Sequence, residues 1–125
     1  MRRLTTLILL LSISIGFSQT NEIDSLALQL AFENQDSLKV DTSLKLIKSL
    51  YEINDFDRAR KYIIEREKLS NKLNYKEGIA EITYYKALVY AEKNDYLNAV
   101  SGYKKSKALF NTLKDTLGVA KVNNS

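Results

Sequence analysis

The sequence predicts an all-α protein, an α-solenoid of antiparallel helix pairs with a period of 40 residues. The chain of 125 residues has no proline and only four glycines, whereas sheets need such residues at their corners. The stretch NDFDRA at 54–59 returns as NDYLNA at 94–99, and 94 − 54 gives 40. A fixed period of this size is typical of arrays in which each unit packs on its neighbours. The length and the 45% apolar composition fit one globular domain.

Residues 1–18 are predicted to be a signal peptide. Arg2 and Arg3 precede a short apolar run, and Gly16-Phe17-Ser18 supplies the small-x-small pattern of a cleavage site before Gln19. The run falls short of the roughly 20 residues that span a bilayer, which disfavours the alternative of an uncleaved membrane anchor. We therefore expect an exported protein, periplasmic or secreted, whose only link to a membrane is this peptide or a missing downstream segment.

Residues 19–38 are predicted to form an N-terminal helix or linker. Within EIDSLALQLAFE, the apolar residues Ile23, Leu26, Ala27 and Leu30 fall on one side of a helix. The pattern predicts helix here, and it leaves open whether that helix docks on the rest of the chain.

Two repeat units follow, at 39–77 and 78–117, and residues 118–125 begin an incomplete third unit. Each unit reads as a helix, an Asn-Asp turn and a second helix. Asn94 tolerates the left-handed conformation at a helix end, and the carboxylate of Asp95 can cap the next helix. The turn is therefore a structural feature rather than a chemical one.

The second helix of each unit carries an alanine and an aromatic residue at matching places. Ala59 and Ala99 are small enough to let paired helices approach closely, and Phe56 and Tyr96 are expected to cover the apolar corner beside the turn. Arg66 stands where the second unit has the small Ser106, so the second helix of the first unit is expected to pack less tightly.

The segment LVYAEKNDYLNAVSGYKKSKAL resembles a tetratricopeptide repeat, which has small and aromatic residues at these places. The resemblance covers about residues 39–125, although the period of 40 exceeds the usual 34. With the signal peptide, the chain is similar to the exported N-terminal region of Bacteroidetes-type sensor histidine kinases and regulators. The ending inside a third unit favours a truncated member of this group.

The resemblance implies that the first helix of each unit lines a groove for a protein or peptide partner. Tyr84 and Leu88 stand where carboxylate-clamping repeats carry Lys and Asn, so no clamp is expected. By helix geometry and by this resemblance, the candidate partner-binding residues are Leu44, Lys48, Tyr51, Glu52, Glu81, Tyr84, Leu88 and Glu92.

Catalysis, cofactors and metals are not expected. The chain has no His and no Cys, so it cannot build a Ser-His or Cys-His pair or a thiolate site. The closest paired carboxylates, Glu65 with Glu67 and Asp55 with Asp57, lie two residues apart and point to different helix faces. Removal of Arg2 and Arg3 with the signal peptide leaves 17 basic residues against 15 acidic ones, a mature net charge of 17 − 15 = +2, so nucleic-acid binding is not expected either.

The eight tyrosines are mostly explained by packing, and Tyr51, Tyr84 and Tyr85 are the ones open to a ligand contact. The expected function is a non-enzymatic protein-binding or scaffold module, as the sensory part of an envelope signalling protein. Two alternatives stay open: a structural repeat protein that associates with itself, and a non-functional fragment of a longer kinase.

Overall fold

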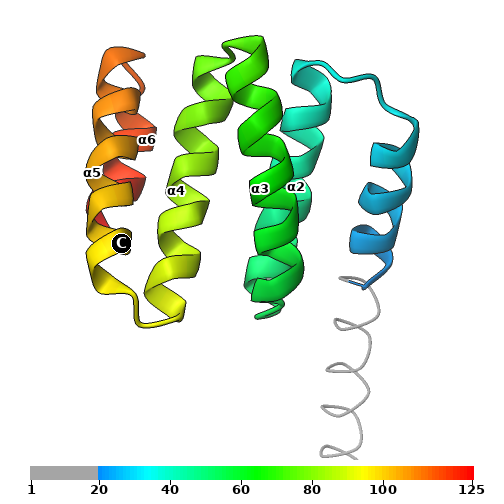
Figure 1. The fold of residues 1–125 in the computed structure, drawn as a ribbon, viewed down its shortest axis with the longest axis horizontal. Coiled ribbons are helices and arrows are strands. Elements are labelled where there is room, and N and C mark those ends of the chain that lie inside the picture. Colours follow the sequence, from blue (N-terminus) through cyan, green and yellow to red (C-terminus); the bar gives the residue numbers. More distant parts are fainter. Residues whose placement is uncertain (1–19) are drawn as a thin grey trace, which may run out of the picture.

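The computed structural model describes residues 20–125, and over this range it contains helices and no strands (Figure 1). The all-α prediction is therefore confirmed for these residues, whereas the predicted signal peptide at 1–18 lies outside them. A helix at residues 20–32, which we call the N-terminal helix, comes first. It is followed by α2 (Ser37–Glu52), α3 (Phe56–Leu73), α4 (Lys76–Glu92), α5 (Tyr96–Thr112) and α6 (Thr116–Asn123).

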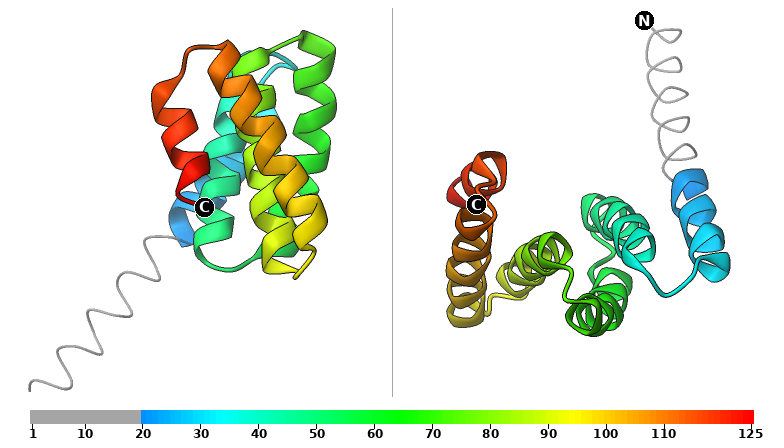
Figure 2. Two further views of the ribbon diagram at one scale, coloured as in Figure 1. Left: turned by 90° about the vertical axis from the view of Figure 1, so that its left-hand side faces the viewer. Right: turned by 90° about the horizontal axis from the view of Figure 1, so that it is seen from above.

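The chain folds back and forth, so that each helix from α2 to α5 packs on the next one (Figure 1). Helix α2 also contacts α4, and Figure 2 shows from above that α3 lies to one side of both. First and second helices of the proposed units thus occupy different sides of the molecule. Within residues 20–125, no helix is both long and apolar enough to cross a membrane.

Four turns share one backbone conformation. At the first of them, the N–H of Asp55 donates to the carbonyl of Leu50 at 2.9 Å, a bond typical of a helix that ends in a left-handed residue. The left-handed residues are spaced by 20, since 74 − 54, 94 − 74 and 114 − 94 all give 20. The turn therefore recurs at half the period found in the sequence. The residues are Asn54 (φ 62°), Asn74 (φ 50°), Asn94 (φ 61°) and Lys114 (φ 55°).

Aspartates begin four of the helices, α2, α3, α5 and α6. The Asp55 carboxylate accepts from the N–H of Arg58 at 3.2 Å, and the Asp95 carboxylate accepts from the N–H of Asn98 at 3.3 Å. Asp115 caps α6 in the same way. The predicted capping role of Asp95 is confirmed, and each such cap contributes about 1 kcal/mol.

The N-terminal helix docks through the residues that its periodicity singled out. Ile23 and Leu30 are 2% and 4% exposed, and they form one cluster with Leu46, Leu50 and Ala59 of α2 and α3. The predicted helix is confirmed. Because its apolar side is covered, it is an integral part of the packed structure rather than a loose linker.

Small residues bring α4 and α5 close together. Ala99 is 2% exposed, as its predicted close-packing role requires. A Cβ atom built on Gly102 would lie 2.8 Å from the Cβ of Ala87, so only glycine fits there without a shift of the helices. The Ser106 hydroxyl donates to the Ala80 carbonyl at 3.0 Å across the same interface.

Arg66 is accommodated inside the structure, and the expectation of looser packing around it is wrong. Its side chain is buried, and its Nε donates to the hydroxyl of Ser43 on α2 at 2.6 Å. That hydroxyl in turn donates to the carbonyl of Lys39 at 2.7 Å. Ala59 and Ile63 on the same helix are also buried, so α3 packs closely on α2.

Tyr96 does not cover an apolar corner, which corrects the expectation for this residue. Its side chain is 64% exposed, and its hydroxyl donates to Asn94 Oδ1 at 2.9 Å. In the first unit, the ring of Phe56 packs on the ring of Tyr51 with centroids 5.4 Å apart. The matching position in the second unit, 51 + 40 = 91, is Ala91. Tyr96 therefore has no equivalent ring to pack against.

Candidate functional site

The predicted partner-binding surface lies on α2 and α4, and we call its eight residues the first-helix face. On α2, Lys48 and Glu52 are exposed. Leu44 and Tyr51 are half-buried, because both pack against the core cluster formed by α2, α3 and α4. The α2 part of this face thus has two exposed charged side chains, and its other two side chains pack on the core.

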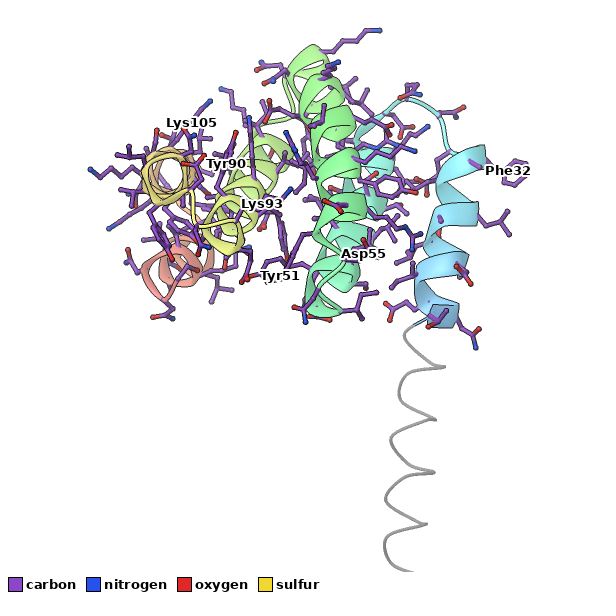
Figure 3. All side chains as sticks on the ribbon, turned by 60° about the horizontal axis from the view of Figure 1, so that its bottom comes forward. Phe32, Tyr51, Asp55, Tyr90, Lys93 and Lys105 are labelled. Carbon is purple, nitrogen blue, oxygen red and sulfur yellow. The ribbon has the colours of Figure 1, made fainter. Side chains whose placement is uncertain are left out.

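A hydrogen bond joins the two helices of the face. The Tyr51 hydroxyl donates to Glu92 Oε1 at 3.0 Å, which links α2 to the end of α4 (Tyr51 is labelled in Figure 3). Burial raises the pKa of Tyr51 to about 12, because the phenolate loses hydration, and the bond to the Glu92 carboxylate adds to the shift. Tyr51 is therefore a neutral donor over the physiological pH range.

At the other end of α4, the face is covered by α6. Lys121 forms an ion pair with Glu81, and its Nζ lies 4.8 Å from the centre of the Tyr84 ring. The Tyr84 hydroxyl lies 2.9 Å from the hydroxyl of Ser125, and the residue is only 7% exposed. Leu88 is half-buried against the same cluster. Glu81, Tyr84 and Leu88 therefore offer little surface to a partner.

Three of the eight residues are accessible charges: Lys48, Glu52 and Glu92. The structure brings the α2 residues and Glu92 together on one side, and it places Glu81 and Tyr84 in the contact with α6. The sequence could not separate these groups. Position 84 fits the groove by helix geometry, and its burial depends on where α6 docks.

A hydrogen bond of Tyr75 was not predicted from the sequence. The Tyr75 hydroxyl donates to Asp41 Oδ1 at 2.8 Å, which ties the start of α4 to α2. Burial, followed by this hydrogen bond, raises the pKa of Tyr75 to about 12. Burial also raises the pKa of Tyr85, and the negative charge of Glu81, one helical turn earlier on α4, adds to the shift. The 34-residue separation of Tyr75 and Asp41 is not the repeat period, so the pattern gave no signal for it.

The tyrosine contacts predict a loss of stability at high pH. The folded-state pKa of Tyr51 and Tyr75 is about 12 against an ordinary 10.0, so the unfolded chain releases these protons first. Their contribution is fully present below pH 10 and is lost as the pH rises toward 12. Urea unfolding followed by circular dichroism between pH 8 and 12 should show a steeper decline for the native chain than for the Tyr51→Phe, Tyr75→Phe double variant.

Tyr96→Phe is the matched control for this pH series, because its ring is mostly exposed. It should follow the native curve. Equal slopes in the native chain and the double variant would contradict the assigned role of the two hydroxyls.

No cluster of three or more His, Cys, Asp or Glu side chains placed to hold a metal ion occurs within residues 20–125. The side chains of the first-helix face supply hydrogen bonds, charges and apolar area. In comparisons with known proteins, no family model, no curated protein and no solved structure matches the chain.

Proposed function

We propose that this protein is a tetratricopeptide-like repeat protein that binds a protein or peptide on its first-helix face and catalyses no reaction. The observation that carries the proposal is the pairing of α2 and α4. These helices come from units 40 residues apart, they lie against each other, and they present Lys48, Glu52 and Glu92 to solvent on one side. A partner with complementary charges would bind across both units.

The contact between Tyr51 and Glu92 supports this role, because it fixes α2 relative to α4 before any partner arrives. A surface that is already ordered loses less conformational entropy when it binds. The two charges on α2, Lys48 and Glu52, are one helical turn apart and have opposite signs. They favour a partner segment with the reverse order of charges.

The proposed setting is the cell envelope, where the module would form the sensory part of a signalling protein. This part of the proposal rests on the signal-peptide pattern at residues 1–18 and on the resemblance of the repeats. Detection of the processed chain in a periplasmic or culture-supernatant fraction would support it, and an unprocessed chain in the cytosol would count against it.

The binding proposal is tested with peptides selected against the full chain from a random display library. Reversing two charges with Lys48→Glu and Glu52→Lys keeps the net charge and should weaken the selected peptides at least about tenfold. The control exchanges Lys68→Glu and Glu22→Lys, two exposed residues on other helices, and should change affinity less than twofold. Equal losses in both variants, or no enrichment of peptides, would contradict the proposal.

A second candidate function, self-association, is favoured by an apolar patch on α5. Leu97 is 88% exposed and Val100 is 49% exposed, and with Tyr96, Ser101 and Lys104 they line a hollow of about 490 Å³. Exposed apolar patches mark interaction surfaces. Sedimentation of the full chain would show a concentration-dependent dimer that Leu97→Asp abolishes, and a monomer at all concentrations would exclude this candidate.

A further inference from the structure

A groove runs between α3 and α5, with α4 as its floor, on the side of α4 away from the first-helix face. It consists of two adjoining cavities of about 230 and 470 Å³, which share Lys86 and Tyr90. Figure 3 labels Tyr90 and Lys93 of its floor and Lys105 of its α5 wall. We call this feature the α3–α5 groove. Its floor residues Ile82, Lys86 and Tyr90 each precede a residue of the first-helix face by two positions. Two residues turn a helix by a little more than half a revolution, so the two surfaces face opposite directions.

The equivalent space 40 residues earlier is filled. There the N-terminal helix, α2 and α3 take the places of α3, α4 and α5, and Leu46 and Leu50 are fully buried. Tyr62 packs against the same cluster. At the matching positions of the groove stand Lys86 (46 + 40), Tyr90 (50 + 40) and Gly102 (62 + 40). The space between α3, α4 and α5, which we call the second interval, lacks the Tyr62 ring and the two buried leucines of the first interval between the N-terminal helix, α2 and α3. The second interval is therefore open.

One wall of the groove is also more polar than the equivalent wall 40 residues earlier. Ala27 and Ala31 on the N-terminal helix correspond to Glu67 and Asn71 on α3, both of which line the groove. Lys86 Nζ lies 3.0 and 3.2 Å from the two carboxylate oxygens of Glu67, so the floor and one wall are tied together by an ion pair. Of the two alanines, Ala27 packs against the apolar cluster and Ala31 is exposed, whereas Glu67 and Asn71 bring hydrogen-bonding groups to the groove.

The lining of the groove is cationic. Arg60, Lys86, Lys93 and Lys105 contribute four positive charges, against Glu67 and Asp95. Lys86 is paired with Glu67, Lys93 lies 3.5 Å from Asp57, and Asp95 is engaged as a helix cap. Within residues 20–125, Arg60 and Lys105 form no ion pair and no side-chain hydrogen bond. These two charges are available to an anionic ligand.

The two available cations lie near opposite ends of the groove. Lys105 is next to Ser106, which bonds to Ala80 near the start of α4, and Arg60 lines the cavity that reaches Lys93 after its end. The two cavities share Lys86 and Tyr90, so Lys105 and Arg60 lie at different positions along one continuous groove. An extended peptide, which rises about 3.3 Å per residue, can pass both cations.

We propose that the α3–α5 groove binds an extended acidic peptide segment that carries two carboxylates at separate positions along its chain. One carboxylate pairs with Arg60 and the other with Lys105. The amide side chain of Asn71 supplies a donor and an acceptor to the peptide backbone, and the amide oxygen of Asn98, whose Nδ2 donates to Asp95, supplies an acceptor. This site is separate from the first-helix face and does not depend on it.

The test is an NMR titration of the isotope-labelled full chain. The probe is a pool of end-capped heptapeptides with Glu at positions 2 and 6 and mixed Ser, Thr, Gly and Ala elsewhere, and the matched pool carries Gln at both positions. The Glu pool should shift the amide signals of Asn71, Asn98, Ser101 and Lys105, and the Gln pool should not. No shifts at millimolar peptide, or shifts centred on Lys48 and Glu52, would overturn the proposal.

A matched pair of double variants separates this site from general charge effects. Arg60→Glu with Lys105→Glu reverses both groove cations, and Lys61→Glu with Lys72→Glu makes the same change at two exposed positions outside the groove lining. The first variant should bind the Glu pool at least about tenfold more weakly, and the second should stay within about threefold of the native chain. Equal losses in two variants that both keep native circular dichroism would refute a defined site.

Discussion

Replacement of Phe110 by alanine is expected to lower the free energy of unfolding by about 3–5 kcal/mol. The ring is 1% exposed and forms one cluster with Ala80 and Tyr84 of α4 and Val122 of α6. It also lies directly on Gly118, where any added Cβ would overlap it. Removal of the ring therefore leaves a cavity that joins three helices. Urea unfolding at neutral pH measures the change.

Tyr96→Ala is the control for this prediction, since it deletes an aromatic ring from the same helix. Because Tyr96 is 64% exposed, its removal should cost less than about 1 kcal/mol. If Phe110→Ala were equally mild, the cluster around it would not act as a core, and the docking of α6 would have to be revised.

Leu30→Asp is expected to detach the N-terminal helix and to lower the free energy of unfolding by about 2–4 kcal/mol. Leu30 is 4% exposed, and a carboxylate at this position would be buried beside Leu46 and Leu50 without a partner. The helix would separate from α2 rather than bury the charge. Hydrogen exchange should then report loss of protection over residues 20–32 together with the reduced stability.

Leu28→Asp makes the same substitution on the same helix, at a position that is 64% exposed. It should leave both the protection of residues 20–32 and the stability within about 0.5 kcal/mol of the native chain. Similar losses in the two variants would mean that helix propensity, and not docking, determines the result.

The sequence was sufficient to predict the helices, two of the turns and the docking side of the N-terminal helix. Asn94 and Asp95 have local reasons for their roles, because left-handed backbone and helix capping depend on neighbouring residues. Ile23 and Leu30 followed from helical periodicity alone. Such predictions succeed because they do not require knowing which helices meet.

Features that depend on contacts between helices could not be predicted in this way. Tyr96 has the residue type expected at a packed corner, and it is exposed because position 91 is Ala91 rather than a second aromatic residue. Tyr84 faces α6 instead of solvent. Arg66 is much larger than its counterpart Ser106, and it fits because the hydroxyl of Ser43 on α2 accepts a hydrogen bond from its Nε.

The difference between Tyr62 in the filled interval and Gly102 at the equivalent position of the open groove also has a consequence for the order of folding. The interval that contains Tyr62 buries Leu46 and Leu50 completely, and the segments that close it are adjacent in sequence. Contacts between nearby segments form fastest, and the N-terminal part of a chain is synthesised first. We therefore expect the folding nucleus to assemble around Tyr62. Helices α4 to α6 would then pack on this nucleus, so the open groove would form only after the filled interval exists.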